Sequence, residues 1–170
     1  MTGEDQRHNL IPSFSCARDL FEATRDAARD ADRISRSIDR MRARESVRAQ
    51  GYRPRVSGGS RSDAMSATDA RVDYEERVRR RRDADYALIG YATGVVYGAG
   101  PCAGGVASLL SPAHADVLWW RFCNAATWEE TADACGMSEK WCRESVTLSL
   151  DQVDAYGPDR VRAGLGLAEG

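Results

Sequence analysis

Apolar side chains recur at seven-residue intervals between about residues 15 and 50. Two sets, three residues apart, supply them: Leu20, Ala27, Ile34 and Met41, and Ala17, Thr24, Ala31 and Ile38. This spacing places one narrow apolar stripe along a helix, as at the a and d positions of a coiled coil. We therefore predict a coiled-coil-like helix over 15–50. Because Ala and Thr bury little apolar area, this helix needs a partner, which is either a second helix of the same chain or another subunit.

Glycine, proline and serine divide the chain after this helix. Residues 51–65, which contain GYRPRVSGGSRSD, predict a flexible Ser/Gly/Arg linker. Residues 66–97 predict a second helix, and residues 98–110, which contain GAGPCAGG, predict a Gly-rich connection. These glycines are not typical of a phosphate-binding loop, because no strand pattern precedes them and no Lys-Ser or Lys-Thr follows. Since no strand pattern occurs in the sequence, we expect an all-α fold, with disordered residues at 1–14 and 157–170.

The predicted second helix combines a partial apolar stripe with a run of arginines. Its apolar positions are Val72, Val78, Leu88, Ala92 and Val95. The basic run RVRRRRDAD, at 77–85, lies in the middle of this helix. A run of like charges on a helix is usually a solvated face, and contact with nucleic-acid phosphates is the sharper alternative.

Residues 111–156 contain the start signals of three short helices. Ser111 followed by Pro112 is typical of an N-cap with proline at the first helical position. The apolar face of this helix consists of Ala115, Leu118, Trp119 and Phe122. Thr127, with Glu130 three residues later, predicts a capping box at the start of the next helix.

Gly136 ends this second short helix, because glycine accepts the left-handed conformation of a sharp turn. Ser138 then caps a third helix that runs to about Ala155. Two helices joined by a three-residue turn that contains Gly predict a helix-turn-helix, and the alternative is a helical hairpin in an ordinary bundle. The core between them is expected to contain Trp128, Cys135, Met137, Cys142, Val146 and Leu150.

In a helix-turn-helix the third helix enters the major groove with its first turns. Arg and Lys side chains there read guanine, and Glu accepts a hydrogen bond from cytosine N4. The N-terminus of the preceding helix offers backbone N–H groups to a phosphate. The candidate DNA-binding residues are Thr127, Trp128, Ser138, Glu139, Lys140, Arg143, Glu144 and Thr147.

The segment ATWEETADACGMSEKWCRESVTLSLDQVD resembles the C-terminal half of sigma-70 region 4. It is more similar still to the sigma-like tails of small phage and prophage transcription regulators, the ArpU-like group. That group carries L-x-x-R-Y, then W-x-E-I-A, a Gly-containing turn, S-x-x-x-V and a terminal A-L. This chain has Leu118 to Phe122 with Arg121, then Trp128, Glu130, Thr131 and Ala132, then Gly136, Ser138 and Cys142, then Ser149 and Leu150.

The resemblance covers about residues 111–154 well and the remainder of the chain loosely. It implies a sigma region 4-like helix-turn-helix domain that binds promoter DNA together with RNA polymerase, in the nucleoid of a bacterial host cell. Thr131 stands where the group has an aliphatic residue, and Cys142 stands where it has Val. Both departures weaken the core of the domain slightly.

Charge is unevenly distributed along the chain. Residues 1–82 have 19 Arg and 14 Asp or Glu, a balance of +5, whereas residues 83–170 have 5 basic and 12 acidic residues, a balance of −7. Residues 111–156 alone have 3 basic and 8 acidic residues, a balance of −5. Such a segment is poorly suited to bind DNA alone, because phosphate neutralisation supplies most non-specific affinity. Either the basic arm between Arg36 and Arg82 supplies phosphate contacts, or a larger complex such as RNA polymerase positions the domain.

No pattern in the sequence indicates catalysis, a cofactor or a metal site. The five cysteines have no two-residue spacing, so we expect neither a zinc ribbon nor a disulfide framework, but buried thiols in a reducing cytosol. His8 and His114 stand in unrelated contexts and suggest no nucleophile-base pair. There is no signal-peptide pattern and no apolar stretch of membrane-spanning length. We expect a cytoplasmic protein without a membrane partner that is not an enzyme.

Three functional hypotheses follow. The first is a phage or prophage sigma-like transcription regulator that binds double-stranded DNA through Lys140, Arg143 and Glu144, with the N-terminal helix forming a homo-oligomer or contacting RNA polymerase. The second is a protein-interaction module that docks on RNA polymerase or another protein without reading DNA. The third and weaker alternative is a phage DNA-packaging subunit, which also joins a helix-turn-helix to an oligomerising helix. The target DNA sequence and the sign of regulation do not follow from the sequence.

Overall fold

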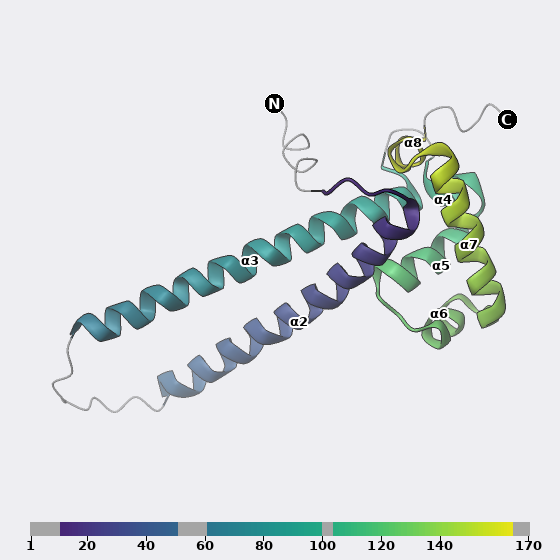
Figure 1. Cartoon of the computed structure of the whole chain (residues 1–170). Coiled ribbons are helices and arrows are strands. Elements are labelled where there is room, and N and C mark those ends of the chain that lie inside the picture. Colours follow the sequence, from purple (N-terminus) through teal and green to yellow (C-terminus); the bar gives the residue numbers. More distant parts are fainter. Residues whose placement is uncertain (1–10, 51–60, 100–103, 165–170) are drawn as a thin grey trace.

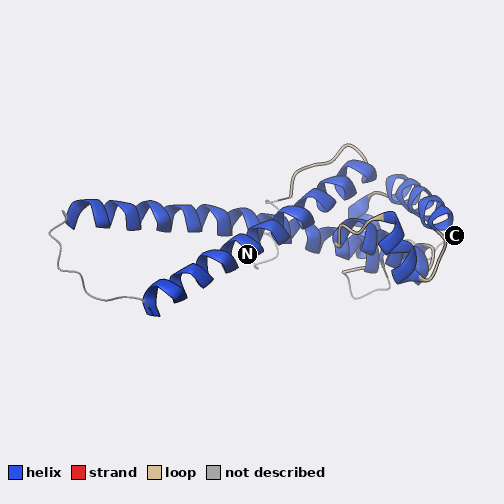
Figure 2. Cartoon of the chain, turned by 90° about the horizontal axis from the view of Figure 1, so that it is seen from below, coloured by secondary structure: helices blue, strands red, loops and turns tan. Residues whose placement is uncertain are grey.

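The computed structural model describes residues 11–50, 61–99 and 104–164. Across these residues the chain forms helices and loops and no strand, which confirms the all-α fold class (Figure 2). Two long helices extend side by side from a head of shorter helices (Figure 1). They are α2 (Ala17–Gln50) and α3 (Arg61–Tyr97), and we call them the hairpin. Among the described residues no helix is both long enough and apolar enough to cross a membrane.

The apolar stripe of α2 is buried, and α3 of the same chain packs against it. The polar member of the stripe, Thr24, is fully buried because its hydroxyl donates to the carbonyl of Leu20 at 2.8 Å. The partner that this thin stripe needs is therefore supplied within the chain. The buried stripe residues are Ala17, Leu20, Thr24, Ala27, Ala31 and Ile34, while Ile38 and Met41 are half-buried.

The bounds of α3 and its apolar stripe differ from the prediction. The helix begins at Arg61, so 61–65 belong to it and not to the predicted linker 51–65, whose other residues lie outside the described part. No Gly or Pro occurs from Arg61 onward until Gly90, so nothing delays the start of the helix until 66. Val72, the first position of the predicted partial apolar stripe, is 48% exposed. The buried side chains of α3 lie at its other end, in Tyr91, Ala92, Val95 and Val96.

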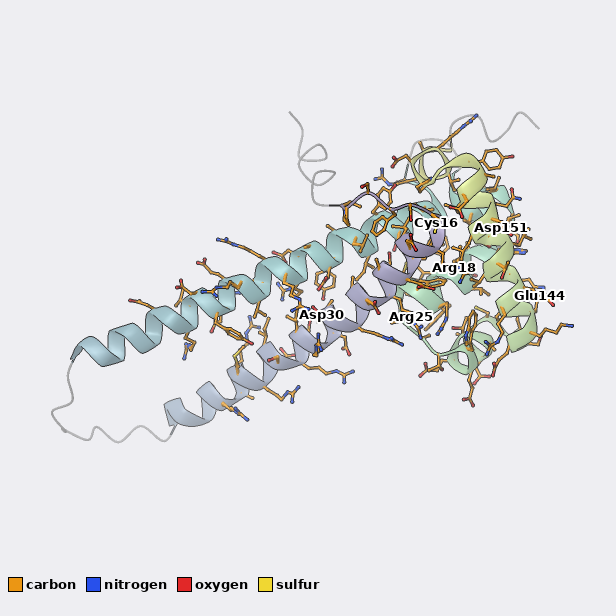
Figure 3. All side chains as sticks on the ribbon, viewed as in Figure 1. Cys16, Arg18, Arg25, Asp30, Glu144 and Asp151 are labelled. Atoms are coloured by element: carbon orange, nitrogen blue, oxygen red, sulfur yellow. The ribbon has the colours of Figure 1, made fainter. Side chains whose placement is uncertain are left out.

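Charged side chains join the two helices of the hairpin at its middle. Asp30 of α2 is buried, and its carboxylate lies 2.5 Å from Nε of Arg81 in α3 and also pairs with Arg33 (labelled Asp30 in Figure 3). Within the basic run, Arg79 and Arg80 are exposed and pair with Glu75 and Glu76 one turn earlier, at 3.6 and 3.5 Å. The run is thus largely a solvated face with local ion pairs, and its contact with phosphates stays a prediction.

The head contains the remaining helices and one apolar core that it shares with the base of the hairpin. Its helices are α4 (Gly105–Leu109), α5 (Pro112–Leu118), the π-helical η1 (Trp119–Cys123), α6 (Trp128–Cys135), α7 (Glu139–Tyr156) and α8 (Pro158–Ala163). Side chains almost completely removed from solvent come from nearly every part of this assembly: Leu20, Phe21, Val95, Val106, Leu118, Cys142, Val153 and Val161. Residues 111–156 therefore do not form a core of their own.

The predicted Gly-rich connection 98–110 is described at 98–99 and 104–110, while 100–103 lie outside the described residues. It contains α4, and its glycines bring two backbones into contact. Gly98 and Gly105 have φ of +88° and +77°, and a Cβ on Gly105 would lie 2.3 Å from the backbone nitrogen of Gly98. Only glycine satisfies both the conformation and the spacing. The connection thereby holds the end of α3 against the start of α4.

Two segments predicted to be disordered pack against the head, so the prediction is wrong for them. Within 157–170, α8 forms because Val161 is fully buried and Asp159 accepts a 2.7 Å hydrogen bond from the hydroxyl of Tyr91. Within 1–14, Ile11 and Phe14 pack against the core. Segments this short carry too few apolar residues to show a period, so the sequence pattern does not predict their burial. Residues 1–10 and 165–170 lie outside the described residues.

Asp85 of α3 provides a test of the hairpin's charge balance. Burial raises the pKa of the Asp85 carboxyl, and the neighbouring Asp30 raises it further. A raised folded-state pKa means that the folded chain holds this proton more tightly than the unfolded chain. The stability that this bound proton gives to the folded chain is fully present below the usual aspartate pKa of about 4. It is lost as the pH rises through the folded-state pKa of Asp85.

We expect Asp85→Asn to raise the melting temperature at pH 7, because it removes the repulsion with Asp30 while keeping a side chain of the same shape. The gain should shrink at about pH 4, near the usual aspartate pKa. Thermal unfolding followed by circular dichroism at both pH values measures this difference. Asp83→Asn, at an exposed carboxylate, is the matched control and should show no such pH-dependent gain. An Asp85→Asn melting temperature below that of the parent chain at pH 7 would contradict the assignment.

Candidate nucleic-acid interface

The α6–α7 pair begins with a complete capping box. The Thr127 hydroxyl accepts a hydrogen bond from the Glu130 N–H at 3.2 Å, and the Glu130 carboxylate accepts one from the Thr127 N–H at 2.7 Å. The second of these bonds lowers the pKa of the Glu130 carboxyl. Ser138 caps α7 through its hydroxyl, which accepts a hydrogen bond from the Trp141 N–H at 3.2 Å. The caps predicted at Thr127 and Ser138 are therefore confirmed.

Gly136 turns the backbone between α6 and α7. Its φ of +66° and ψ of +31° place it in the left-handed region. The Met137 N–H donates to the Ala132 carbonyl at 3.0 Å, and the Gly136 N–H donates to Asp133 at 3.3 Å. This pair of bonds is a Schellman motif, which satisfies the last carbonyls of α6. Three residues, Gly136 to Ser138, thus separate the two helices, as predicted.

The two faces of α7 differ sharply in burial. Cys142, Val146, Leu150 and Val153 are buried against the head. Met137 was predicted to join this core, but it is 41% exposed because the turn that holds it lies outside the packed faces. Trp128 and Cys135 are half-buried and pack against the core. The outer face carries the exposed residues Glu139, Lys140, Arg143, Glu144 and Thr147.

Ion pairs within α7 connect the charged groups of its outer face. Arg143 pairs with Glu139 at 3.0 Å, and Lys140 lies 3.9 Å from Glu144, which Figure 3 labels at the edge of the head. The Thr147 hydroxyl donates to the Arg143 carbonyl at 3.1 Å. Exposed pairs one turn apart contribute only about 0.3–0.5 kcal/mol each. A ligand that offers hydrogen bonds to these groups can therefore replace them at little cost.

The N-terminus of α6, where backbone N–H groups at Thr127 and Trp128 were predicted to meet a phosphate, has the Thr127 N–H already engaged. The Thr127 N–H donates to the Glu130 carboxylate and is not free to hold a phosphate, whereas the Thr127 hydroxyl only accepts in the capping box and keeps its own proton to donate. The Trp128 ring lies beneath two guanidinium groups, with that of Arg121 at 4.3 Å and that of Arg143 at 4.6 Å from the ring centroid. Trp128 thus holds two guanidinium groups close together, an arrangement that the sequence did not predict.

Arg121 of η1 is the buried member of this arrangement. Its side chain is 9% exposed, and its Nη1 donates to the Ala126 carbonyl at 2.6 Å. Burial lowers the pKa of its guanidinium, and Arg25, Arg29 and Arg143 lower it further. The L-x-x-R pattern drew attention to Arg121 in the sequence. No sequence signal placed Arg25 and Arg29 near it, because they lie on a helix about 100 residues away.

The turn can be tested by comparing two glycines. Gly136→Ala should destabilise the chain by about 1–2 kcal/mol, because an L-residue is strained in the left-handed region. A Cβ at Gly136 meets no atom within 4 Å, so the cost comes from the backbone alone. Gly90→Ala is the matched control, since Gly90 lies within α3 with equally open space. It should stabilise the chain by about 0.5–1 kcal/mol. Denaturant unfolding measures both changes, and the same sign in both variants would contradict the left-handed turn.

The contact of Arg143 with Trp128 can be tested with a double-mutant cycle. Trp128→Leu and Arg143→Gln should show a coupling of about 0.5–1 kcal/mol in the free energy of unfolding, because either change alone removes the stacking. Trp141→Leu with Arg143→Gln is the control, since residues two apart on a helix do not face each other. That pair should be additive within about 0.3–0.5 kcal/mol. Additivity in the first cycle would exclude an energetic role for the stacking.

Metal-binding clusters and disulfides do not contribute to this region. Among the described residues no three His, Cys, Asp or Glu side chains are grouped to hold a metal ion. Cys16, Cys123, Cys135 and Cys142 have free thiols, and burial raises the pKa of Cys123 to about 11. Comparison of the chain with protein-family models, with curated proteins and with solved structures finds no match.

Proposed function

We propose that the protein is a DNA-binding transcription regulator of the phage or prophage sigma-like type. In this proposal the α6–α7 pair is a sigma region 4-like helix-turn-helix, and α7 enters the major groove. The observation that carries the proposal is the capped helix pair, turned at a left-handed Gly136, whose second helix leaves one polar face exposed. The same residues carry the resemblance to the ArpU-like group.

The exposed face of α7 has the chemistry for base recognition. Lys140 and Arg143 donate hydrogen bonds of the kind that guanine O6 and N7 accept. Glu139 and Glu144 accept hydrogen bonds of the kind that cytosine N4 donates. Each lies within the first two turns of α7, the part of a recognition helix that contacts bases. The exposed ion pairs with which these four residues are engaged are weak enough to exchange for base contacts.

Non-specific affinity needs a source outside residues 111–156, because their charge balance is −5. The N-terminal part of the chain, with its balance of +5 over residues 1–82, is one source. A second source is docking on RNA polymerase, which would position the domain on promoter DNA even if the domain itself binds DNA weakly. Both sources of affinity are compatible with a hairpin that projects from the head (Figure 1).

A second function is favoured by the acidic surface of the head. If the α6–α7 pair binds a basic surface of RNA polymerase or of another protein, acidic side chains such as Glu129 and Asp133 contribute to the contact. Both are exposed in α6. Co-purification with RNA polymerase after nuclease treatment, with no retention of duplex DNA by the purified chain, would support this function over DNA reading.

Selection from a pool of randomised duplexes tests DNA reading directly. The immobilised full chain should enrich a motif, and its affinity for that motif should exceed its affinity for random duplex. We expect Lys140→Ala with Arg143→Ala to lower this ratio at least about tenfold, since each good base contact supplies about 1–3 kcal/mol of discrimination.

The control for charge is Arg77→Ala with Arg80→Ala, two exposed arginines of α3. This variant should change both affinities by a similar factor and leave their ratio unaltered. Failure to enrich any motif, or an unchanged ratio in the Lys140 and Arg143 variant, would refute α7 as the recognition helix.

A further inference from the structure

The start of α2 lies directly against η1 of the head. The rings of Phe21 and Phe122 are 5.5 Å apart between centroids. Arg25 and Arg29 follow Phe21 by one and two helical turns, so they lie along the same side of α2. Figure 3 shows Arg25 on the side of α2 that is turned towards the head. Both arginines thus act on the charge of Arg121 from a separate helix, and Arg29 also borders the groove between α2 and α3 beside Asp30.

The guanidinium groups of Arg121 and Arg143 share the Trp128 ring, and Arg25 and Arg29 lie near enough to act on the charge of Arg121. Three of these four groups lack a carboxylate partner. Arg143 pairs with Glu139, but Arg121 bonds to a backbone carbonyl. Within the described part of the chain, no carboxylate lies within 4 Å of the guanidinium groups of Arg25, Arg29 or Arg121. The Nε atoms of Arg25 and Arg121 are buried and have no hydrogen-bond partner there. We call these four residues the arginine cluster.

An unpaired buried cation is costly, and several close together add mutual repulsion. Burial and neighbouring arginines lower the pKa values of Arg25 and Arg121, and at Arg25 the carboxylates of Asp26 and Glu22 offset part of this effect. An anion that enters the cluster relieves both costs at once. Arginine is the side chain best matched to a phosphate, since its planar fork donates two parallel hydrogen bonds to phosphate oxygens.

We propose that Arg25, Arg29, Arg121 and Arg143 form a site for a backbone phosphate of duplex DNA. This proposal rests on the proposed function and adds α2 to the DNA interface. The position favours DNA over other anions, because Arg143 belongs both to the cluster and to the exposed face of α7. Arg29 and Arg143, which are exposed, contact the phosphate, and Arg25 and Arg121 support it with charge from more buried positions.

Salt dependence of binding isolates a phosphate contact. Fluorescence anisotropy of a labelled duplex with the full chain, at salt concentrations between about 50 and 200 mM, gives the slope of log affinity against log salt. Arg25→Gln with Arg29→Gln should make this slope shallower by about 1, the loss of one phosphate contact, and should weaken binding for all duplex sequences alike. Its melting temperature should equal or exceed that of the parent chain, because repulsion within the cluster is relieved. Stability that is kept while affinity falls distinguishes a lost contact from misfolding.

Arg77→Gln with Arg80→Gln removes the same charge from α3 and is the matched control. If this control changes the slope as much as the Arg25 and Arg29 variant does, the effect comes from overall positive charge, and the proposed site is overturned. An unchanged slope in the Arg25 and Arg29 variant overturns the site as well. If the parent chain binds no duplex, the proposed function and the DNA phosphate both fail. Calorimetric titration with inorganic pyrophosphate then identifies the source: binding that the Arg25 and Arg29 variant loses would assign the cluster to a free polyphosphate. If duplex binding persists while the slope is unchanged, only the site fails.

Discussion

Burial of the base of the hairpin in the core of the head is the constraint on which the remaining architecture depends. Phe21 of α2 packs on Phe122 of η1, and Val95 and Val96 of α3 enter the same core. Polar contacts reinforce this junction, since the Ala17 N–H at the start of α2 donates to the Asp154 carboxylate of α7 at 2.5 Å. The long helices and the α6–α7 pair therefore form one body, and α7 is oriented by residues far from it in the sequence.

Local signals predicted the features that depend on a few neighbouring residues. The capping box at Thr127, the cap at Ser138 and the left-handed Gly136 each need only backbone groups within four residues, so their residue types identify them. The apolar stripe of α2 could be predicted equally well, because its seven-residue period is sustained over several turns. These signals were enough to predict an all-α fold and the two helices around Gly136.

Features that depend on distant residues were missed for the same physical reason. Phe21 lies outside the a and d stripe, and its burial against Phe122 depends on how α2 crosses the head. In the sequence pattern, Arg25 and Arg29 occupy ordinary solvated positions of a coiled coil, and only the tertiary structure brings them near Arg121. The helix α8 is stabilised by the hydroxyl of Tyr91, about 70 residues earlier. Tertiary packing overrides the weak local pattern at each of these places.

Net charge describes the candidate interface poorly. The chain has a formal charge of −2, and residues 111–156 are more acidic still, yet arginines from η1 and α7 stack on a single tryptophan and two arginines of α2 act on the charge of Arg121. Affinity for an anion follows the local field and the geometry of donors more than the sum over a domain. An acidic domain and a phosphate site are thus compatible in one molecule, provided that the cations are concentrated on one side.

The hydrogen bond from Ala17 to Asp154 has a mechanical consequence. It ties the first residue of a 34-residue helix to the last turns of α7. A helix of that length extends about 50 Å, so a tilt of about 5° at the junction displaces its far end by about 4 Å. Because the hairpin and α7 form one body, a small change in how α7 sits on a partner displaces the far end of the hairpin by a much larger distance.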